Sequence, residues 1–203
     1  MLATIITITI IIVIIILLLA KWHDDRKYIC AGDRRAYLVN PGDNEEEARE
    51  SANTLAAIAA RLDELLVYLK DTYPTSRDIQ RLARRFDSQR IAETRENANL
   101  TAYTVNKGHV LSMCLRPRNS IVTAKAHVEE NKDNIYDINL LMYVAIHEMA
   151  HIMSLTEGHT DEFYQHFRFL LSNAIDIGIY EFVDYVDQPT DYCGVLINEK
   201  ILM

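Results

Sequence analysis

Two histidines and a glutamate in residues 147–151 have the types and spacing of a catalytic metal site. His147 and His151 are four residues apart, so on a helix they share one face and both imidazoles can reach a single Zn²⁺ at about 2 Å. Glu148 projects beside that face, where its carboxylate can take a proton from a water that zinc activates and later return it to a departing amine. The spacing therefore predicts metal-dependent hydrolysis of an amide bond, with Glu148 as the general base and acid.

A catalytic zinc needs three protein ligands and one open position, so a third ligand is expected. His159 is the favoured candidate, because Gly158 before it permits a sharp turn back over the helix. Other side chains near this position could ligate instead: Asp161, Glu162, His166 and Glu181. A different interpretation is a pair of half-buried histidines on an amphipathic helix with no metal, which would leave Glu148 without a role.

Zinc stabilises only part of the negative charge that develops on the carbonyl oxygen during such a reaction. Tyr185 and Tyr192 lie in a C-terminal segment without regular patterning that could fold over the site, although a packing role suits each equally well. Cys193 could also approach the metal, but a thiol of this kind is more often a small buried apolar group. The three cysteines are too few and too scattered to predict a disulfide framework.

The elements that position these residues are expected to be two helices. Asp137 is a suitable N-cap for a helix from Ile138 to about Leu155. The next helix begins after Thr160 and ends near Gly178. Its apolar stripe consists of Phe163, Phe167, Leu170, Leu171 and Ala174.

Two further helices are predicted in a helical region that packs on this core. Asn44 starts a long helix that Pro74 ends, and a shorter helix runs from about Arg77 to Phe86. The stripe of the long helix consists of Leu55, Ile58, Leu62, Leu65, Leu66 and Leu69. The short helix carries a basic patch of Arg81, Arg84 and Arg85, for which a solvated face is more typical than a contact with nucleic acid or lipid.

Alternating patterns near residue 101 predict a small sheet. Tyr103–Val105 and Val110–Leu115 flank the turn Asn106-Lys107-Gly108 and form a hairpin, and Ile121–Thr123 is a further short strand. Val110–Leu115 is the candidate edge for binding an extended peptide by strand addition. Helices and strands together predict an α+β fold, with a small sheet packed on the helix that carries the two histidines.

The run HEMAHIMSLTEGHTDEF, in which Phe163 follows His159 by four residues, resembles the zincin-like metallopeptidases of the WLM and SprT-like group. Three other stretches resemble a membrane-anchored subgroup from large DNA viruses: Met113–Arg116, Leu141–Ile146, and Asp184-Tyr185 with Tyr192-Cys193-Gly194. The resemblance covers about residues 100–195. It implies a minimal zincin-like domain that hydrolyses polypeptides, with zinc held by His147, His151 and His159 and with Glu148 as the catalytic acid and base.

The N-terminal segment is of a different class. Leu2–Ala20 contains no charged side chain, Gly or Pro, and its 19 residues would span about 28 Å as a helix, close to the hydrocarbon thickness of a bilayer. No basic region precedes it, which favours an uncleaved transmembrane anchor over a signal peptide. The cations that follow, Lys21, Arg26, Lys27, Arg34 and Arg35, place residues 21–203 in the cytosol. The glycosylation sequon at Asn99 argues for the opposite side.

Composition and charge complete the prediction. The 203 residues are 49% hydrophobic and 25% charged, which excludes a wholly disordered chain. Residues 126–203 hold three Lys and Arg against 14 Asp and Glu, which argues against nucleic-acid binding there and suits a cation or a positively charged substrate. The expected organisation is an anchor (1–20), a juxtamembrane linker (21–43), a helical region (44–100) and a metallopeptidase core (101–203).

The rival function is a non-catalytic, zinc-stabilised scaffold that holds a partner at a membrane through residues 2–20. Glu148 argues against it, because a structural zinc site has no need of a carboxylate in that position.

Overall fold

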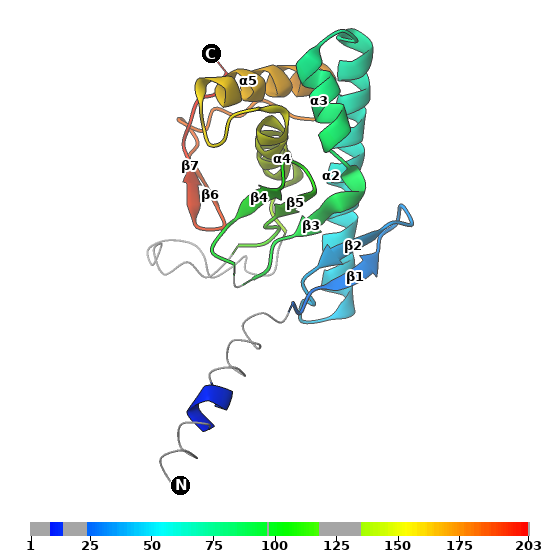
Figure 1. The fold of residues 1–203 in the computed structure, drawn as a ribbon, viewed down its shortest axis with the longest axis vertical. Helices are drawn as coiled ribbons and strands as arrows, with labels where there is room; N and C mark the ends of the chain where they lie inside the picture. Colours follow the sequence, from blue (N-terminus) through cyan, green and yellow to red (C-terminus); the bar gives the residue numbers. More distant parts are fainter. Residues whose placement is uncertain (1–8, 14–23, 97, 118–134, 203) are drawn as a thin grey trace.

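The computed structural model describes residues 9–13, 24–96, 98–117 and 135–202, and shows a five-stranded sheet, helices and a small separate hairpin (Figure 1). The predicted α+β class is confirmed. In the part of the chain that is described, no helix is long and apolar enough to cross a membrane. The predicted anchor, Leu2–Ala20, lies outside the described residues except for residues 9–13, and the predicted strand Ile121–Thr123 lies wholly outside them.

The sheet has the order β1-β2-β3-β5-β4. β1 and β5 run antiparallel to β2 and β4, respectively, whereas β2 and β5 both run parallel to β3. The strands are β1 (Lys27–Cys30), β2 (Ala36–Val39), β3 (Ile91–Glu93), β4 (Ala102–Val105) and β5 (Val110–Met113).

The segment predicted as a juxtamembrane linker, residues 21–43, contains two strands, β1 and β2. Alternate side chains of β2, those of Tyr37 and Val39, are 1% and 0% exposed and belong to the core. Each strand has only four residues, which is too short for alternation to stand out beside the glycine and proline of this segment.

The hairpin of β4 and β5 is confirmed, but β5 is not an edge strand. β3 pairs with it on one side and β4 on the other, so the sheet ends at β4. The turn between β4 and β5 needs Gly108, because its φ of +109° is one that other residues rarely adopt. A Cβ at this position would also lie 2.7 Å from the Arg85 carbonyl oxygen, which is too close.

Four predicted helices are confirmed, and so is Asp137 as an N-cap. The helices are α2 (Glu45–Thr72), α3 (Arg77–Arg85), α4 (Ile138–Met153) and α5 (Asp161–Asp176), and their N-caps are Asn44, Ser76, Asp137 and Thr160. α2 packs on β1, β2 and β3, α4 packs on β4 and β5, and the two helices contact each other, so they cover one face of the sheet. α5 contacts α4 and helps to enclose it (Figure 1). α4 is therefore buried on nearly all sides, which explains its almost continuous apolar sequence.

The C-terminal segment forms a hairpin of β6 (Thr190–Tyr192) and β7 (Val195–Ile197), where the sequence predicts irregular structure. A disulfide joins Cys193 in its turn to Cys114 at the end of β5, a pair that the number and spacing of the cysteines do not predict. Seventy-nine residues separate the two thiols, and nothing in their spacing reveals that the fold brings them together.

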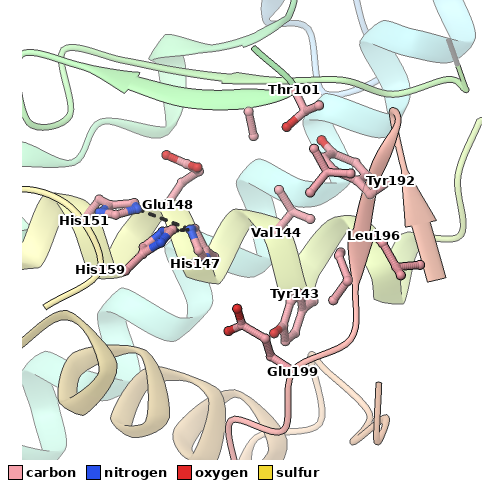
Figure 2. Close-up of a pocket in the computed structure, with 13 residues that line it drawn as sticks. Thr101, Tyr143, Val144, His147, Glu148, His151, His159, Tyr192, Leu196 and Glu199 are labelled. Carbon is pink, nitrogen blue, oxygen red and sulfur yellow. Dashed lines mark hydrogen bonds between the residues drawn. The ribbon is translucent and has the colours of Figure 1, made fainter. Parts of the chain in front are cut away.

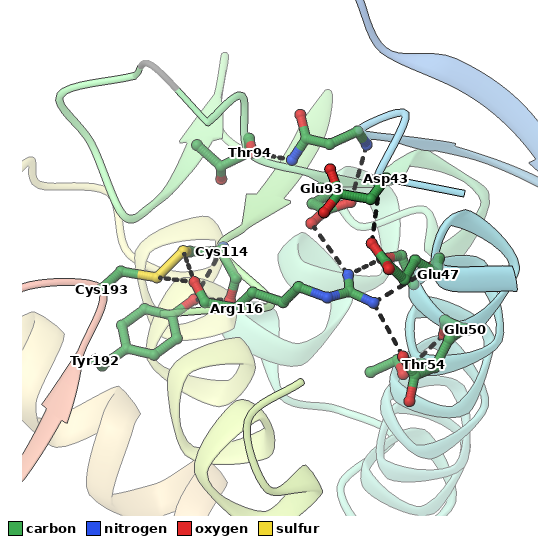
Figure 3. A network of polar contacts seen from close by, with 12 residues as sticks. Asp43, Glu47, Glu50, Thr54, Glu93, Thr94, Cys114, Arg116, Tyr192 and Cys193 are labelled. Atoms are coloured by element: carbon green, nitrogen blue, oxygen red, sulfur yellow. Dashed lines mark hydrogen bonds and ion pairs between the residues drawn. A yellow bond between two sulfur atoms is a disulfide. The ribbon is translucent and has the colours of Figure 1, made fainter. Parts of the chain in front are cut away.

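Arg116 fixes the chain next to this disulfide (Figure 3). Its guanidinium donates to Ser51 Oγ, to the Glu47 carbonyl oxygen at 3.2 Å and to Glu50 Oε2 at 3.0 Å, all on α2. It also faces the buried carboxylate of Glu93 at 3.9 Å. The end of β5, and with it Cys114, is thereby held against the long helix.

The disulfide should stabilise the domain. Replacing both Cys114 and Cys193 with alanine is expected to lower the free energy of unfolding by about 2–5 kcal/mol, because the bond closes a long loop in the unfolded chain. Urea denaturation followed by circular dichroism measures the change. Cys30→Ala serves as the control, because this thiol is free and exposed. Equal stability of the double variant and the oxidised protein would contradict the expectation.

Candidate metal centre

Three imidazoles converge beside α4 (Figure 2). The Nε2 atom of His147 lies 3.2 Å from His151 Nε2 and 3.1 Å from His159 Nε2. Tetrahedral zinc with bonds of about 2.0–2.1 Å places its nitrogen ligands about 3.3 Å apart. The three residues thus fit a Zn²⁺ ion with one coordination position left for other ligands. In the described part of the chain, they are the group of side chains close enough together to share a metal ion.

Aromatic side chains of α5 contact all three imidazoles, and Phe163 lies 4.7 Å from the ring of His159. The Phe163 ring stacks on that of His151 with centroids 4.3 Å apart and meets His147 edge-on at 4.8 Å. Phe167 also contacts His147, at 5.1 Å. The apolar stripe predicted for this helix is confirmed as buried, and part of it restricts the rotamers of the candidate ligands.

His159 reaches the other two histidines through a short loop after α4. Gly158 takes a φ of +76° in this loop, in agreement with the predicted sharp turn. The carboxylate of Glu162 accepts hydrogen bonds from the backbone nitrogens of Leu155 and Thr156, at 3.0 and 2.9 Å. These bonds lower the pKa of Glu162 to about 2, the Leu155 bond most of all. Glu162 therefore shapes the loop and is not one of the converging ligands.

The remaining candidates for the third ligand also lie outside the converging group. Nδ1 of His166 is 2.9 Å from Ser154 Oγ, and its Nε2 is 3.6 Å from an oxygen of Asp78. Asp161 and Glu181 do not join the three histidines. The structure therefore places His159, and none of its four competitors, with His147 and His151.

Three cations bind the end of α4 and the start of the loop. Arg81 donates to the Met153 carbonyl oxygen at 2.7 Å, and Arg85 donates to that of Ile152 at 2.9 Å. Lys107 in the β4–β5 turn donates to the Thr156 carbonyl oxygen at 2.7 Å. The last carbonyls of a helix lack partners within it and carry partial negative charge, so cations stabilise them. The predicted solvated face is thus wrong for Arg81 and Arg85, whereas Arg84 is exposed.

Glu148 lies next to the three histidines and is only 5% exposed. Burial raises the pKa of its carboxyl to about 8, and burial together with the charges of neighbouring histidines lowers the pKa of His147 to about 3. Burial likewise lowers the pKa of His151 to about 4. Both imidazoles are consequently neutral at pH 7, which is the form that binds a metal.

A cavity of about 320 Å³ adjoins the histidines and Glu148. Beside them, its walls come from the start of β4, from α4, from the C-terminal hairpin and from the chain after it. These wall residues are Thr101, Ala102, Tyr143, Val144, Tyr192, Val195, Leu196, Ile197 and Glu199. Tyr143 precedes His147 by one helical turn, a spacing that could have indicated it from the sequence. No sequence signal indicates Glu199.

The two tyrosines considered for oxyanion stabilisation are placed differently. The Tyr192 ring lines the cavity, but its hydroxyl donates to the Cys114 carbonyl oxygen at 2.8 Å and accepts from the Cys114 amide at 3.1 Å. Tyr185 is buried with its ring 4.7 Å from that of Tyr143 and does not line the cavity. Cys193 forms the disulfide with Cys114, so it has no free thiol that could bind the metal.

Comparisons with known proteins identify viral relatives. Over 172 residues, the chain is 33% identical to an uncharacterized protein of Acanthamoeba polyphaga mimivirus, an alignment that covers 83% of this chain and 80% of the relative. The chain belongs to the family of this mimivirus protein. Uncharacterized proteins of invertebrate iridescent viruses 6 and 3 are 30% and 33% identical over 91 and 96 residues, which is 45% and 49% of their lengths.

No family model matches the chain. The crystal structure of Wss1 from Saccharomyces cerevisiae aligns with a TM-score of 0.45 and 17% identity, covering 68% of this chain and 86% of that one. A mutant of Wss1 gives a TM-score of 0.46 at the same identity. Similarity at this level carries no argument about activity. The predicted resemblance to viral proteins agrees with the relatives found, and membership of the WLM and SprT-like group stays a prediction.

Replacement of His159 should show whether this residue is a metal ligand. His159→Ala is expected to weaken zinc binding at least about 100-fold, the upper end of the loss seen when an outer-shell partner of a metal ligand is removed. Competition against a chromophoric chelator measures the affinity. His109→Ala is the matched control, since His109 is an exposed histidine that contacts Arg90 instead. Equal zinc affinities for the two variants would exclude His159 as a ligand.

The buried carboxyl should make the stability of the metal-free protein depend on pH. The folded-state pKa of Glu148, about 8, lies above its ordinary value of 4.5. Between these values the folded protein holds a proton that the unfolded chain releases, so this stabilising contribution is complete below about pH 4.5 and is lost as the pH rises towards 8.

Glu148→Gln removes this titration and leaves those of the histidines, whose stabilising contribution falls below pH 6.5 as the unfolded chain takes up protons. The stability of the variant relative to the parent protein is therefore expected to increase from pH 5 to pH 8. Urea denaturation of both proteins in the presence of a chelator measures the difference. A difference that does not change with pH would contradict the assignment.

Proposed function

We propose that the chain is a zinc-dependent metallopeptidase that uses Glu148 to activate water for attack on a peptide carbonyl. The observation that carries the proposal is the convergence of three imidazoles beside a buried carboxylate at the wall of an accessible cavity, with His147 Nε2 3.2 and 3.1 Å from the other two Nε2 atoms and all three ligand atoms within 4.8 Å of one another. When bound, zinc supplies a Lewis acid that lowers the pKa of water and polarises a carbonyl.

In this proposal, the histidines bind the metal and Glu148 transfers protons. His147, His151 and His159 hold the metal as neutral imidazoles. Glu148 takes a proton from the attacking water at its carboxylate and delivers it to the nitrogen of the departing amine. A nearby dication favours the ionised form of Glu148, which offsets the effect of burial and prepares the carboxylate to act as a base. The Tyr192 hydroxyl is occupied by Cys114 and Tyr185 lies off the cavity, so neither takes part in the proposed mechanism.

β4 is the proposed binding edge for an extended substrate, in place of Val110–Leu115. No strand pairs with the outer side of β4 among the described residues, and residues at its start, Thr101 and Ala102, line the cavity. A peptide that adds to this edge forms main-chain hydrogen bonds with it and projects alternate side chains towards the cavity. This arrangement would bring a scissile carbonyl to the three histidines through main-chain contacts.

We also propose that the apolar segment Leu2–Ala20 attaches this domain to a membrane. The length and uninterrupted hydropathy of the segment support the attachment. The substrate would then be a polypeptide that is present at the surface of that membrane.

Glu148→Gln tests the enzymatic proposal. The variant is expected to retain zinc and to cleave peptides about 10²–10⁴-fold more slowly, because it keeps the shape of the side chain and loses the proton acceptor. Elemental analysis gives the zinc content, and a library of fluorescence-quenched peptides incubated with the full chain gives the rate. Glu64→Gln, on an exposed position of α2, is the control. Unchanged biological activity in a zinc-loaded Glu148→Gln protein would support the scaffold instead.

A further inference from the structure

The cavity beside the metal centre has an apolar wall with one additional charge. Its lining from α4 and β7 includes Val144, Leu196 and Ile197. Apart from Glu148 and the histidines, the charged side chain that lines it is Glu199. In Figure 2, the Glu199 carboxylate lies next to the Tyr143 ring. A ligand that extends from the three histidines along this cavity would therefore meet this carboxylate.

Anchors on both sides fix the segment that carries Glu199. Before it, the hairpin is tied to the end of β5 by the Cys193 disulfide and by both hydrogen bonds of the Tyr192 hydroxyl. After it, Lys200 pairs with Asp184 at 2.6 Å and Ile201 is buried in the core. Glu199 is thus an exposed side chain on a well-held backbone, and its charge has a defined place at the cavity.

The charge of Glu199 is not balanced by a neighbouring cation in the described structure. Lys200, its sequence neighbour, is engaged by Asp184. The effect of Glu199 on its surroundings is seen at Tyr143, where burial raises the pKa of the hydroxyl and the negative charge of Glu199 raises it further. The C-terminal part of the chain is acidic as a whole, with three Lys and Arg against 14 Asp and Glu in residues 126–203. Among the described residues, no lysine or arginine is thus paired with the Glu199 carboxylate.

We propose that Glu199 makes this cavity a subsite for a positively charged group of the substrate next to the scissile bond. This inference rests on the proposed peptidase function and specifies its substrate class. Lysine and arginine side chains fit best, since their alkyl stems can lie along Val144 and Leu196 while the cation meets the carboxylate. The volume of about 320 Å³ can accommodate one such side chain. The N-terminal amine of a peptide has the same charge and is the other possible source.

Binding tests this subsite without a requirement for turnover. Zinc-loaded full chain carrying Glu148→Gln is titrated with fluorescent peptides that differ at one position, which is Lys, Met or Glu. The lysine peptide is expected to bind about two- to fivefold more tightly than the methionine peptide, as for an exposed ion pair, and the glutamate peptide more weakly. The preference should shrink in 0.5 M salt, which shortens the Debye length to about 4 Å.

Variants at position 199 identify the source of the preference. In the same Glu148→Gln background, Glu199→Gln should abolish the preference for lysine, and Glu199→Lys should shift it towards glutamate. Glu64→Gln, which removes an exposed carboxylate far from the cavity lining, should keep it. Acetylation of the peptide N-terminus separates the two sources of charge. If the amine occupies the subsite, acetylation weakens binding of all three peptides, and Glu199→Gln removes this effect. If the lysine side chain occupies the subsite, the preference for lysine remains after acetylation.

The outcomes separate this inference from the proposed function. Preferential binding of lysine peptides that depends on Glu199 supports the subsite even where the parent protein cleaves none of them, a result that would overturn the peptidase proposal alone. Cleavage or binding with equal preference for Lys, Met and Glu, or a lysine preference that Glu199→Lys leaves unchanged, would overturn the subsite while the peptidase proposal stands.

Discussion

Three imidazole nitrogens lie close together, and hydrogen bonds among them cannot satisfy all three. His147 Nε2 approaches both His151 Nε2 and His159 Nε2 within 3.2 Å, yet a neutral imidazole nitrogen either donates one hydrogen bond or accepts one. Protonation does not solve the problem, because burial and neighbouring charge lower the pKa of His147 to about 3. A divalent cation at the centre accepts all three lone pairs at once. The arrangement therefore makes chemical sense around a metal and is costly without one.

The rest of the domain supplies the stability that keeps these side chains in place. α4 carries two of them and is buried between the sheet and α5, so its position cannot shift without disturbing the core. Phe163 blocks alternative rotamers of the imidazoles. The loop that presents His159 is held by Lys107 through its carbonyls and by Glu162 through its amides. Ligand geometry thus depends on residues that never touch the metal.

Local patterns made much of this architecture predictable. A spacing of four residues places His147 and His151 on one helical face, and N-caps such as Asp137 and Thr160 act within a single turn. Features that depend on distant parts of the chain were not predictable. β3 has three residues and gives no pattern, yet it moves β5 to the interior of the sheet. The sequence alone indicates a solvated face for Arg81 and Arg85, because their partners, the last carbonyls of α4, are distant in the chain.

The disulfide links the chemistry of the cavity to the compartment in which the domain resides. Disulfides persist in oxidising environments, whereas the cations after Leu2–Ala20 favour a cytosolic domain. The sequon at Asn99 is exposed and agrees with the former. In a reducing compartment, the Tyr192 hydroxyl would still bind the Cys114 backbone, but the covalent tie between the hairpin and β5 would be lost. Because this hairpin forms one wall of the cavity and precedes Glu199, the disulfide ties the position of that wall to β5.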